Sequence, residues 1–327
     1  MRPQTSLPPD EINRGLFDAV AGDGRPLLIF TGALLILAGA FALFLSAAGH
    51  FLPHDVQFLG MTAEQLCAFK NCSIVHFMFH DRVAFGGALV SIGALYIWLA
   101  EFPLRQGQAW AWWLFIASGL IGFGSFLAYL GYGYLDSWHG VATVFLLAFF
   151  IGGLYRLRAI SAGWSGIKSM AQRGFNDSWR STSGIGRALL LATAVGMVFG
   201  GLTVMTFGMT RVFVPQDLEF MQLEPSDLRN ISDRLIPLIA HDRAGFGGAI
   251  ATCGVLVLFS VWCGKASRSL WQVLALAGVV GFAAAIGVHP LVGYTDLFHL
   301  APAFAGALMF IIGLVLSYRS MCVENES

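Results

Sequence analysis

HDRVAFGGA, the stretch at residues 80–88, recurs almost unchanged as HDRAGFGGA at residues 241–249. Two further strings recur in the same order: LPHDVQF at 52–58 matches VPQDLEF at 214–220, and GYLDSWH at 133–139 matches GYTDLFH at 293–299. The offsets are 241 − 80 = 161, 214 − 52 = 162 and 299 − 139 = 160. Three matches in one order at nearly one offset indicate an internal duplication. The chain therefore consists of two related halves.

The composition indicates a membrane protein. Of the 327 residues, 57% are hydrophobic and only 12% are charged, and the mean hydropathy is +0.71. A soluble domain carries about 25% charged residues, so the surface charge of a soluble protein is missing. The net charge is zero, which argues against a nucleic-acid partner. The lipid bilayer is the partner that we expect.

Eight apolar windows are long enough to cross about 30 Å of hydrocarbon, which takes about 20 helical residues. They are residues 26–48, 74–100, 109–131, 136–156, 186–209, 235–262, 269–289 and 296–318. Apolar and polar residues do not alternate in these windows as they do in a strand, so we expect helices. The predicted fold is an all-α integral membrane protein. Its eight transmembrane helices form two tandem four-helix bundles, related by a pseudo-two-fold axis along the membrane normal.

The polar segments divide the chain and predict its orientation. Residues 1–25 form a polar N-terminal segment, 26–157 and 186–318 the two halves, 158–185 a basic linker, and 319–327 the tail. Most Lys and Arg residues fall on the side of the linker and both termini. Basic loops stay in the cytoplasm, so we expect cytoplasmic termini, and the bacterial inner membrane as the location.

Four histidines stand at corresponding places in the two halves. His80 and His241 fall in the first turns of the second span of each half, and His139 and His299 begin the fourth spans. Ionisable groups inside a span are costly and mark functional sites. All four histidines would lie near the outer boundary of the membrane. We expect His80 to face His139, and His241 to face His299, as metal ligands within each half.

The neighbouring residues suggest supporting roles. The candidate catalytic residues, which would orient ligands or relay protons, are Asp81, Asp136, Asp242 and Asp296. An alternative is that these carboxylates pair with the motif arginines or cap helix starts. The further cofactor-binding candidates are Arg82, Arg243, Tyr134, Tyr294, Gly87 and Gly248.

Two chemistries suit facing histidines. The first is bis-imidazole ligation of heme b, in which Gly87 and Gly248 make room for the flat ring and Arg82 and Arg243 pair with propionates. The second is a zinc site in a membrane hydrolase, built from the same histidines and aspartates. A proton- or ion-coupled transporter is a third hypothesis. The outer clustering of the charges argues against it.

The arrangement resembles heme A synthase, a family with eight spans and one histidine pair per half on the outer side. The resemblance covers residues 26–318 and includes the spacings 139 − 80 = 59 and 299 − 241 = 58. It implies a heme-binding oxidoreductase or electron-transfer protein, with a quinone or another membrane redox protein as partner. Where that family has a catalytic Glu three residues before the first histidine, this chain has Phe77 and Leu238.

The other polar residues are unrepeated or lie in loops. Cys67 and Cys72 fall in the first long outer loop, where oxidation is permitted, and we expect a disulfide between them; heme A synthases carry a cysteine pair at this place. His289 has no histidine counterpart in the first half, and we expect a packing role for it. Asp55 and Asp217 recur in the outer loops shortly after a proline, which is typical of turns; a lid over the site is the alternative.

Overall fold

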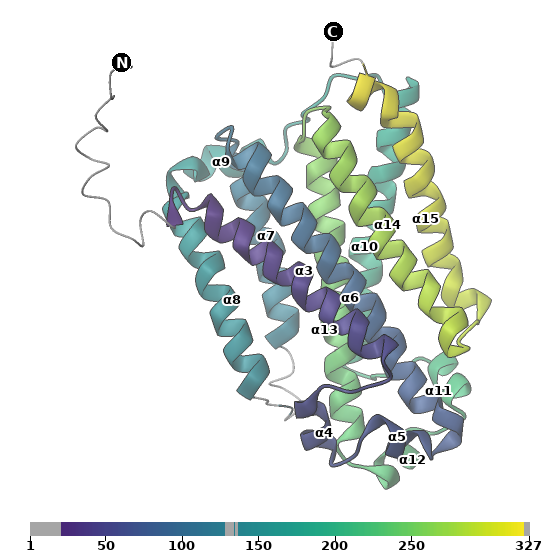
Figure 1. Cartoon of the computed structure of the whole chain (residues 1–327). Coiled ribbons are helices and arrows are strands. Elements are labelled where there is room, and N and C mark those ends of the chain that lie inside the picture. Colours follow the sequence, from purple (N-terminus) through teal and green to yellow (C-terminus); the bar gives the residue numbers. More distant parts are fainter. Residues whose placement is uncertain (1–20, 128–133, 135–136, 324–327) are drawn as a thin grey trace, which may run out of the picture.

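Long helices run roughly side by side in the computed structural model (Figure 1). The structure describes residues 21–127, 134 and 137–323, apart from the side chains of Ser137 and His139. The long helices are α3 (Arg25–Ala47), α6 (Ser73–Leu99), α7 (Ala109–Leu127), α8 (Ser137–Arg156), α10 (Thr182–Met209), α13 (Leu235–Cys263), α14 (Arg268–Val292) and α15 (Leu297–Tyr318). The described part of the chain contains no β-strand. The all-α prediction is confirmed.

Most of these helices are long enough to cross a membrane. Within the described residues, seven helices are long and apolar enough to cross a bilayer. The apolar part of α8, Gly140–Arg156, is shorter. Large apolar side chains face outward along the helices, among them Phe44, Leu120 and Val315. These features support an integral membrane protein in contact with lipid, with seven of the eight expected spans.

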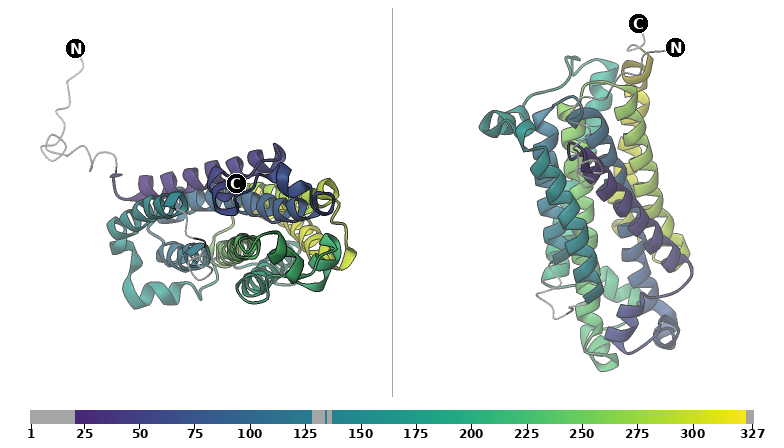
Figure 2. Two further views of the ribbon diagram at one scale, coloured as in Figure 1. Left: turned by 90° about the horizontal axis from the view of Figure 1, so that it is seen from below. Right: turned by 60° about the vertical axis from the view of Figure 1, so that its left-hand side comes forward.

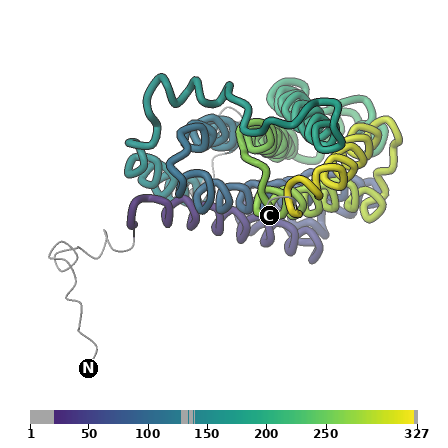
Figure 3. The backbone as a smooth tube through the Cα atoms, turned by 90° about the horizontal axis from the view of Figure 1, so that it is seen from above, coloured from purple at the N-terminus to yellow at the C-terminus, as the bar shows by residue number. Residues whose placement is uncertain are grey.

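Helices α6 and α13, which carry the repeated motif, form the centre. The apolar stretch of α6 is 72% buried and that of α13 is 67% buried, whereas the other five candidate spans are 22–39% buried. Helix α3 packs along α6, and α10 packs along α13. Each central helix also packs on a helix of the other half, α6 on α14 and α13 on α7. The left view of Figure 2 and Figure 3 look along the helices, from below and from above. The prediction of two separate tandem bundles is not confirmed, because the halves interlock.

The motif glycines allow these contacts between halves. A Cβ atom on Gly87 would lie 2.3 Å from the Cβ of Ala284 on α14. A Cβ atom on Gly248 would lie 1.8 Å from Oγ of Ser125 on α7. Glycine lets helices in a membrane approach closely. The room that these two glycines provide is therefore filled by neighbouring helices, not by a flat ring as we expected.

Four short helices cover one end of the bundle, at the bottom of Figure 1. They are α4 (Pro53–Leu59), α5 (Ala63–Cys67), α11 (Pro215–Met221) and α12 (Pro225–Ile231). The remaining short helix, α9 (Gly163–Ser169), lies in the linker between the halves. Cys67 and Cys72 form the expected disulfide at the covered end. Beneath the short helices, buried apolar residues such as Phe77, Leu228 and Tyr294 make a core of their own. This second core separates the polar ends of α6 and α13 from water.

Candidate metal centre

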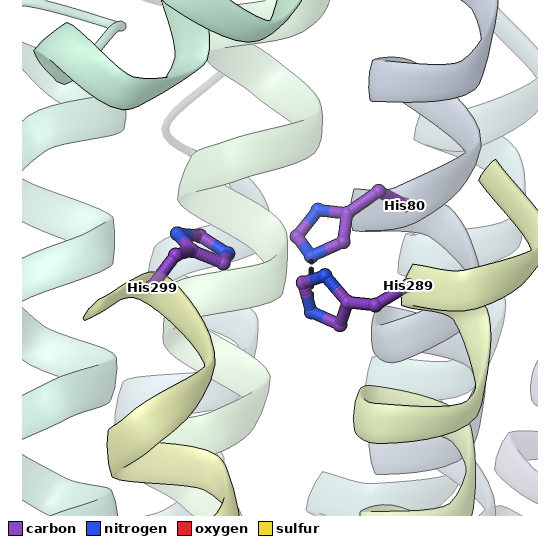
Figure 4. A group of neighbouring side chains, drawn as sticks. All are labelled: His80, His289 and His299. Carbon is purple, nitrogen blue, oxygen red and sulfur yellow. Dashed lines mark hydrogen bonds between the residues drawn. The ribbon is translucent and has the colours of Figure 1, made fainter. Parts of the chain in front are cut away.

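Three histidines meet where α6, α14 and α15 come together. His80 lies in the second turn of α6, His289 in the last turn of α14 and His299 in the first turn of α15. The Nε2 atoms of His80 and His289 are 3.1 Å apart. One nitrogen from each of the three rings lies within 4.8 Å of the others. The His80 and His289 rings face each other, and the His299 ring lies across from them (Figure 4).

The second nitrogen of each ring has a neighbour outside the triad. His80 Nδ1 lies 2.9 Å from Oδ1 of Asp81, and His289 Nδ1 lies 2.7 Å from the carbonyl oxygen of Tyr294. His299 Nδ1 lies 3.5 Å from the phenol oxygen of Tyr294. The Nε2 atoms of His80 and His289 therefore face each other, within hydrogen-bond distance.

The turn between α14 and α15 positions two of these ligands. Gly293 ends α14 with a φ of 78°, a conformation that glycine adopts without strain. The chain then reverses through Tyr294 to Asp296, whose Oδ1 accepts a hydrogen bond of 2.7 Å from the backbone N–H of His299. This is an N-cap, the alternative considered for Asp296. Its role in the described structure is to start α15.

A buried ion-pair cluster surrounds the triad. Arg243 donates through Nε to Asp81 at 3.2 Å and through Nη2 to Asp217 at 3.1 Å, and its Nη1 reaches the carbonyl oxygen of Val212 at 2.8 Å. The Tyr294 hydroxyl donates to Asp217 at 2.9 Å. The side chains of Arg243, Asp81 and Asp217 are 6%, 1% and 0% exposed. Two carboxylates against one guanidinium leave one surplus negative charge beside the histidines.

The other half repeats this cluster. Arg82 donates to Asp55 at 2.7 Å and to Asp242 at 2.8 Å, and the hydroxyl of Tyr134 donates to Asp55. Each motif arginine thus binds the loop aspartate of its own half and the motif aspartate of the other half. The ion pairs are thus reciprocal between the two copies of the motif. They join the halves across the α6–α13 contact.

The histidines pair differently from the prediction. His299 lies next to His80 of the other half, with ring centroids 5.3 Å apart. His241 packs instead against Phe126 and Tyr134, at centroid distances of 5.5 and 5.0 Å. The correction follows from the interlocked halves, because α6 faces α14 and α15 while α13 faces α7. The side chain of His139 and the whole of Asp136 lie outside the described residues.

Three participants were not recognised from the sequence as site residues. Asp55 and Asp217 were expected in turns, but each is buried against a motif arginine. Their recurrence at an offset of 217 − 55 = 162 was the available signal. His289 was expected to be a packing residue. The corresponding residue of the first half, 160 positions earlier, is Tyr129. The comparison of the two halves therefore did not single out His289.

Burial also sets the ionisation of the two tyrosines in the turns between spans. Desolvation raises the pKa of the Tyr294 phenol well above its usual range, and the charge of Asp217 raises it further. The pKa of Tyr134 is raised by the same two effects, with Asp55 as the neighbouring carboxylate. Both phenols therefore stay protonated and act as hydrogen-bond donors at neutral pH.

Asp81 lines a cavity of about 80 Å³ to which none of the triad histidines contributes. A single water needs about 10–15 Å³ on this measure, so the cavity holds a small polar group or several waters. Residues of α3, α4, α6, α7, α13 and the loop before α4 line it: Ala42, Leu45, Ser46, His50, Leu52, Asp55, Asp81, Arg82, Phe85, Phe126, His241, Asp242 and Gly245. The cavity and the triad share Asp81 as a common wall.

The chain matches no protein-family model, no curated protein and no solved structure.

Proposed function

We propose that this protein is a membrane hydrolase that holds one divalent transition metal, with zinc as the first candidate, on His80, His289 and His299. The observation that carries the proposal is the convergence of three ring nitrogens within 4.8 Å of one another. Three neutral imidazoles leave one coordination position open on a tetrahedral metal, as in catalytic zinc sites. The outer hydrogen bonds of the rings fit the same assignment, since metal-bound histidines are oriented in this way.

The distances suit a small metal ion. Zn–N bonds of about 2.0–2.1 Å at tetrahedral angles place two ligand nitrogens about 3.3 Å apart and their ring centroids about 5 Å apart. His80 and His289 nitrogens are 3.1 Å apart, and the three pairs of ring centroids are 4.5, 5.3 and 5.2 Å apart. The His80–His289 nitrogen pair and the three centroid distances are therefore close to those of a single tetrahedral centre.

A bis-histidine heme fits these three rings less well. Two axial nitrogens on opposite sides of an iron are about 4 Å apart, and the ring centroids are more than about 6 Å apart. The measured centroid distances are all shorter. Arg82 and Arg243, the expected propionate partners, already bind carboxylates. The prediction of a heme oxidoreductase with a quinone or redox-protein partner thus has less support than the metal site.

The charge of the surroundings suits a divalent cation. Asp81 and Asp217 outnumber Arg243 by one negative charge, which would favour a cation at the triad. Bound zinc lowers the pKa of its water to about 7 and so supplies a nucleophile for hydrolysis. The chain itself contributes the orientation of the rings through Asp81 and Tyr294.

The membrane arrangement belongs to the same proposal. We infer that all eight long helices cross the bilayer, with both termini in the cytoplasm and, in bacteria, the inner membrane as the location. The basic linker supports this orientation. The triad then lies near the outer boundary, beneath the short helices. The two halves remain related by a pseudo-two-fold axis along the membrane normal, although they interlock.

Elemental analysis of the purified protein tests the proposal. After chelation and reloading with zinc or cobalt, we expect one metal ion per chain. His289→Ala should abolish loading, whereas His76→Ala, on α6 but outside the triad, should retain it. Cobalt should give the visible absorption of a four-coordinate site. A Soret band in the untreated protein, or loading that survives His289→Ala, would contradict the proposal.

A further inference from the structure

We propose that the start of α10 binds the phosphate group of an anionic phospholipid, with Arg187 and Arg173 as its cationic ligands. Helix α10 begins beside the last turn of α15, since a Cβ atom on Gly186 would lie 2.6 Å from Oγ of Ser317. This is the end of the bundle opposite the short helices and the metal triad (Figure 1). The site is therefore separate from the proposed metal centre.

Arg187 is a buried cation whose hydrogen-bond donors are unused. Its side chain is 0% exposed, and none of its three guanidinium nitrogens has a hydrogen-bond partner among the described residues. Its ion-pair partner, Asp177, lies 3.8 Å from Nε, which is too long for a hydrogen bond. The Phe175 ring packs on the guanidinium, with its centroid 3.8 Å from Cζ. Buried donors without acceptors are costly, so an anion that accepts from Arg187 would be bound favourably.

The charges around Arg187 also favour an anion. Within the described part of the chain, the charged groups that act on it are Asp177 and Arg173. Arg173 donates to the carbonyl oxygens of Phe175 at 2.9 Å and Asp177 at 3.4 Å, and its guanidinium lies 4.9 Å from the centroid of the same Phe175 ring. The two arginines thus outnumber Asp177 by one positive charge. Guanidinium groups suit phosphate because their donors match its oxygens.

The first turn of α10 adds backbone donors. Ser181 caps the helix, since its Oγ accepts a hydrogen bond of 3.1 Å from the backbone N–H of Gly184. The N–H groups of Thr182 and Ser183 come before it and, like the first N–H groups of any α-helix, have no acceptor within the helix. Such a helix start attracts phosphate through these donors and through the helix dipole.

The outward face of α10 favours a lipid over a free phosphate. Ile185, Val195 and Phe199 are 45%, 40% and 67% exposed along this helix, which is one of the candidate membrane spans. Acyl chains that lie beside these side chains would bring the phosphate to the membrane boundary, where α10 begins. Trp179, just before the helix, is 43% exposed, and tryptophan is enriched at this boundary in membrane proteins.

The first half satisfies the equivalent arginine with its own carboxylates. Arg187 corresponds to Arg25, 162 residues earlier. Arg25 binds Asp23 at 2.7 Å and lies 3.7 Å from Glu101, and its side chain is 24% exposed. Neither carboxylate recurs in the second half, so the two copies have diverged here. At the offsets of 162 and 161, the corresponding residues are Ile185 and Trp262.

Native mass spectrometry in neutral detergent tests the binding with three probes. Phosphatidylglycerol is the expected ligand. Phosphatidylcholine has the phosphate and the tails without a net charge, and glycerol 3-phosphate has the phosphate without the tails. We expect phosphatidylglycerol to bind about 5-fold or more tightly than phosphatidylcholine, and about 10-fold or more tightly than glycerol 3-phosphate. Equal binding of phosphatidylcholine would overturn the charge argument, and equal binding of glycerol 3-phosphate would overturn the lipid assignment.

Three substitutions locate the site. Arg187→Gln should weaken phosphatidylglycerol binding about 10-fold or more by removing charged donors. Arg25→Gln, the same change at the corresponding position of the first half, should leave the binding constant unchanged. Arg173→Gln, at an exposed position, should weaken binding about 5-fold, and it keeps the test decisive if Arg187→Gln does not fold. An equal loss in Arg25→Gln, or unchanged binding in Arg173→Gln, would overturn the proposal.

Asp177→Asn distinguishes a binding site from an ion pair with a purely structural role. This substitution removes the carboxylate that competes with phosphate for Arg187, so phosphatidylglycerol should bind about 5-fold more tightly. A structural ion pair predicts no gain, and unchanged or weaker binding in Asp177→Asn would therefore contradict the assignment. Because the site lies at the opposite end of the bundle from the triad, failure of the metal proposal leaves this test intact.

Discussion

Replacing Arg243 with Met removes the only guanidinium that Asp81 and Asp217 share among the ion pairs of the described residues. The side chains of the three residues are 6%, 1% and 0% exposed, so water does not replace the lost partner. Removing one member of a buried ion pair costs about 3–5 kcal/mol. Both carboxylates and the carbonyl oxygen of Val212 lose a donor. We therefore expect Arg243→Met to lower the free energy of unfolding by an amount in the upper part of this range.

Denaturation with sodium dodecyl sulfate in neutral detergent micelles, followed by circular dichroism, measures this loss. Arg105→Met is the matched control, because Arg105 pairs with Glu101 at 2.5 Å but is 65% exposed. An exposed pair contributes about 0–1 kcal/mol. The double variant Arg243→Met/Asp217→Asn should recover part of the loss, since it removes one orphaned charge. A loss in Arg243→Met no larger than that of the control would refute the reasoning.

Three further predictions concern the metal shell, the helix contacts and the phenols. Tyr294→Phe removes the hydroxyl beside His299 and should weaken zinc binding about 10–100-fold. Competition with a chelator measures this change. Tyr134→Phe, the matching substitution in the other half, should change zinc binding by less than about 3-fold. Gly87→Ala should lower the free energy of unfolding by about 1–3 kcal/mol through overpacking, because the added Cβ would meet α14. Gly124→Ala is the control: its Cβ would meet nothing within 4 Å, so it should be neutral or stabilising in the same denaturation assay. The raised phenol pKa values of Tyr294 and Tyr134 predict a contribution to stability that is complete below about pH 10 and is lost as the pH rises further. Absorbance at 295 nm should show these two phenols ionising only when the protein unfolds. Ionisation of all tyrosines near pH 10 in the folded protein would contradict this prediction.

The helices themselves could be predicted from the sequence. The window 26–48 became Arg25–Ala47 and the window 235–262 became Leu235–Cys263. A long apolar run in a membrane has one solution for its backbone hydrogen bonds, the helix. Local composition therefore determines these elements, and tertiary contacts have little influence on where they begin and end.

The partners of the helices could not be predicted in the same way. In a duplicated chain, α6 presents the same motif to the third and fourth helices of either half, so the sequence pattern fits packing within a half and packing across halves equally well. The glycines at positions 87 and 248 mark close contacts, but they do not identify the neighbour. Pairing His80 with His139 assumed the first arrangement, and the structure has the second, in which α6 packs on α14.

The same ambiguity hid His289. It ends α14 in a place where the first half has a tyrosine, and only the packing of α14 on α6 brings it to His80. The repeated aspartates at 55 and 217 were visible in the sequence, but a proline before each favoured a turn. Asp217 in fact has both roles, since it accepts a hydrogen bond of 2.8 Å from the backbone N–H of Val214 and also binds Arg243.

X-ray absorption spectroscopy of the protein loaded with zinc tests the central claim most directly, because it reports the ligands of the metal itself. The triad of His80, His289 and His299 predicts one shell of four N or O atoms at about 2.0 Å, with the multiple scattering of three imidazoles. His289→Ala should remove one imidazole from that pattern or abolish loading. A shell that contains sulfur, or a native protein whose metal is six-coordinate iron in a porphyrin, would contradict the account.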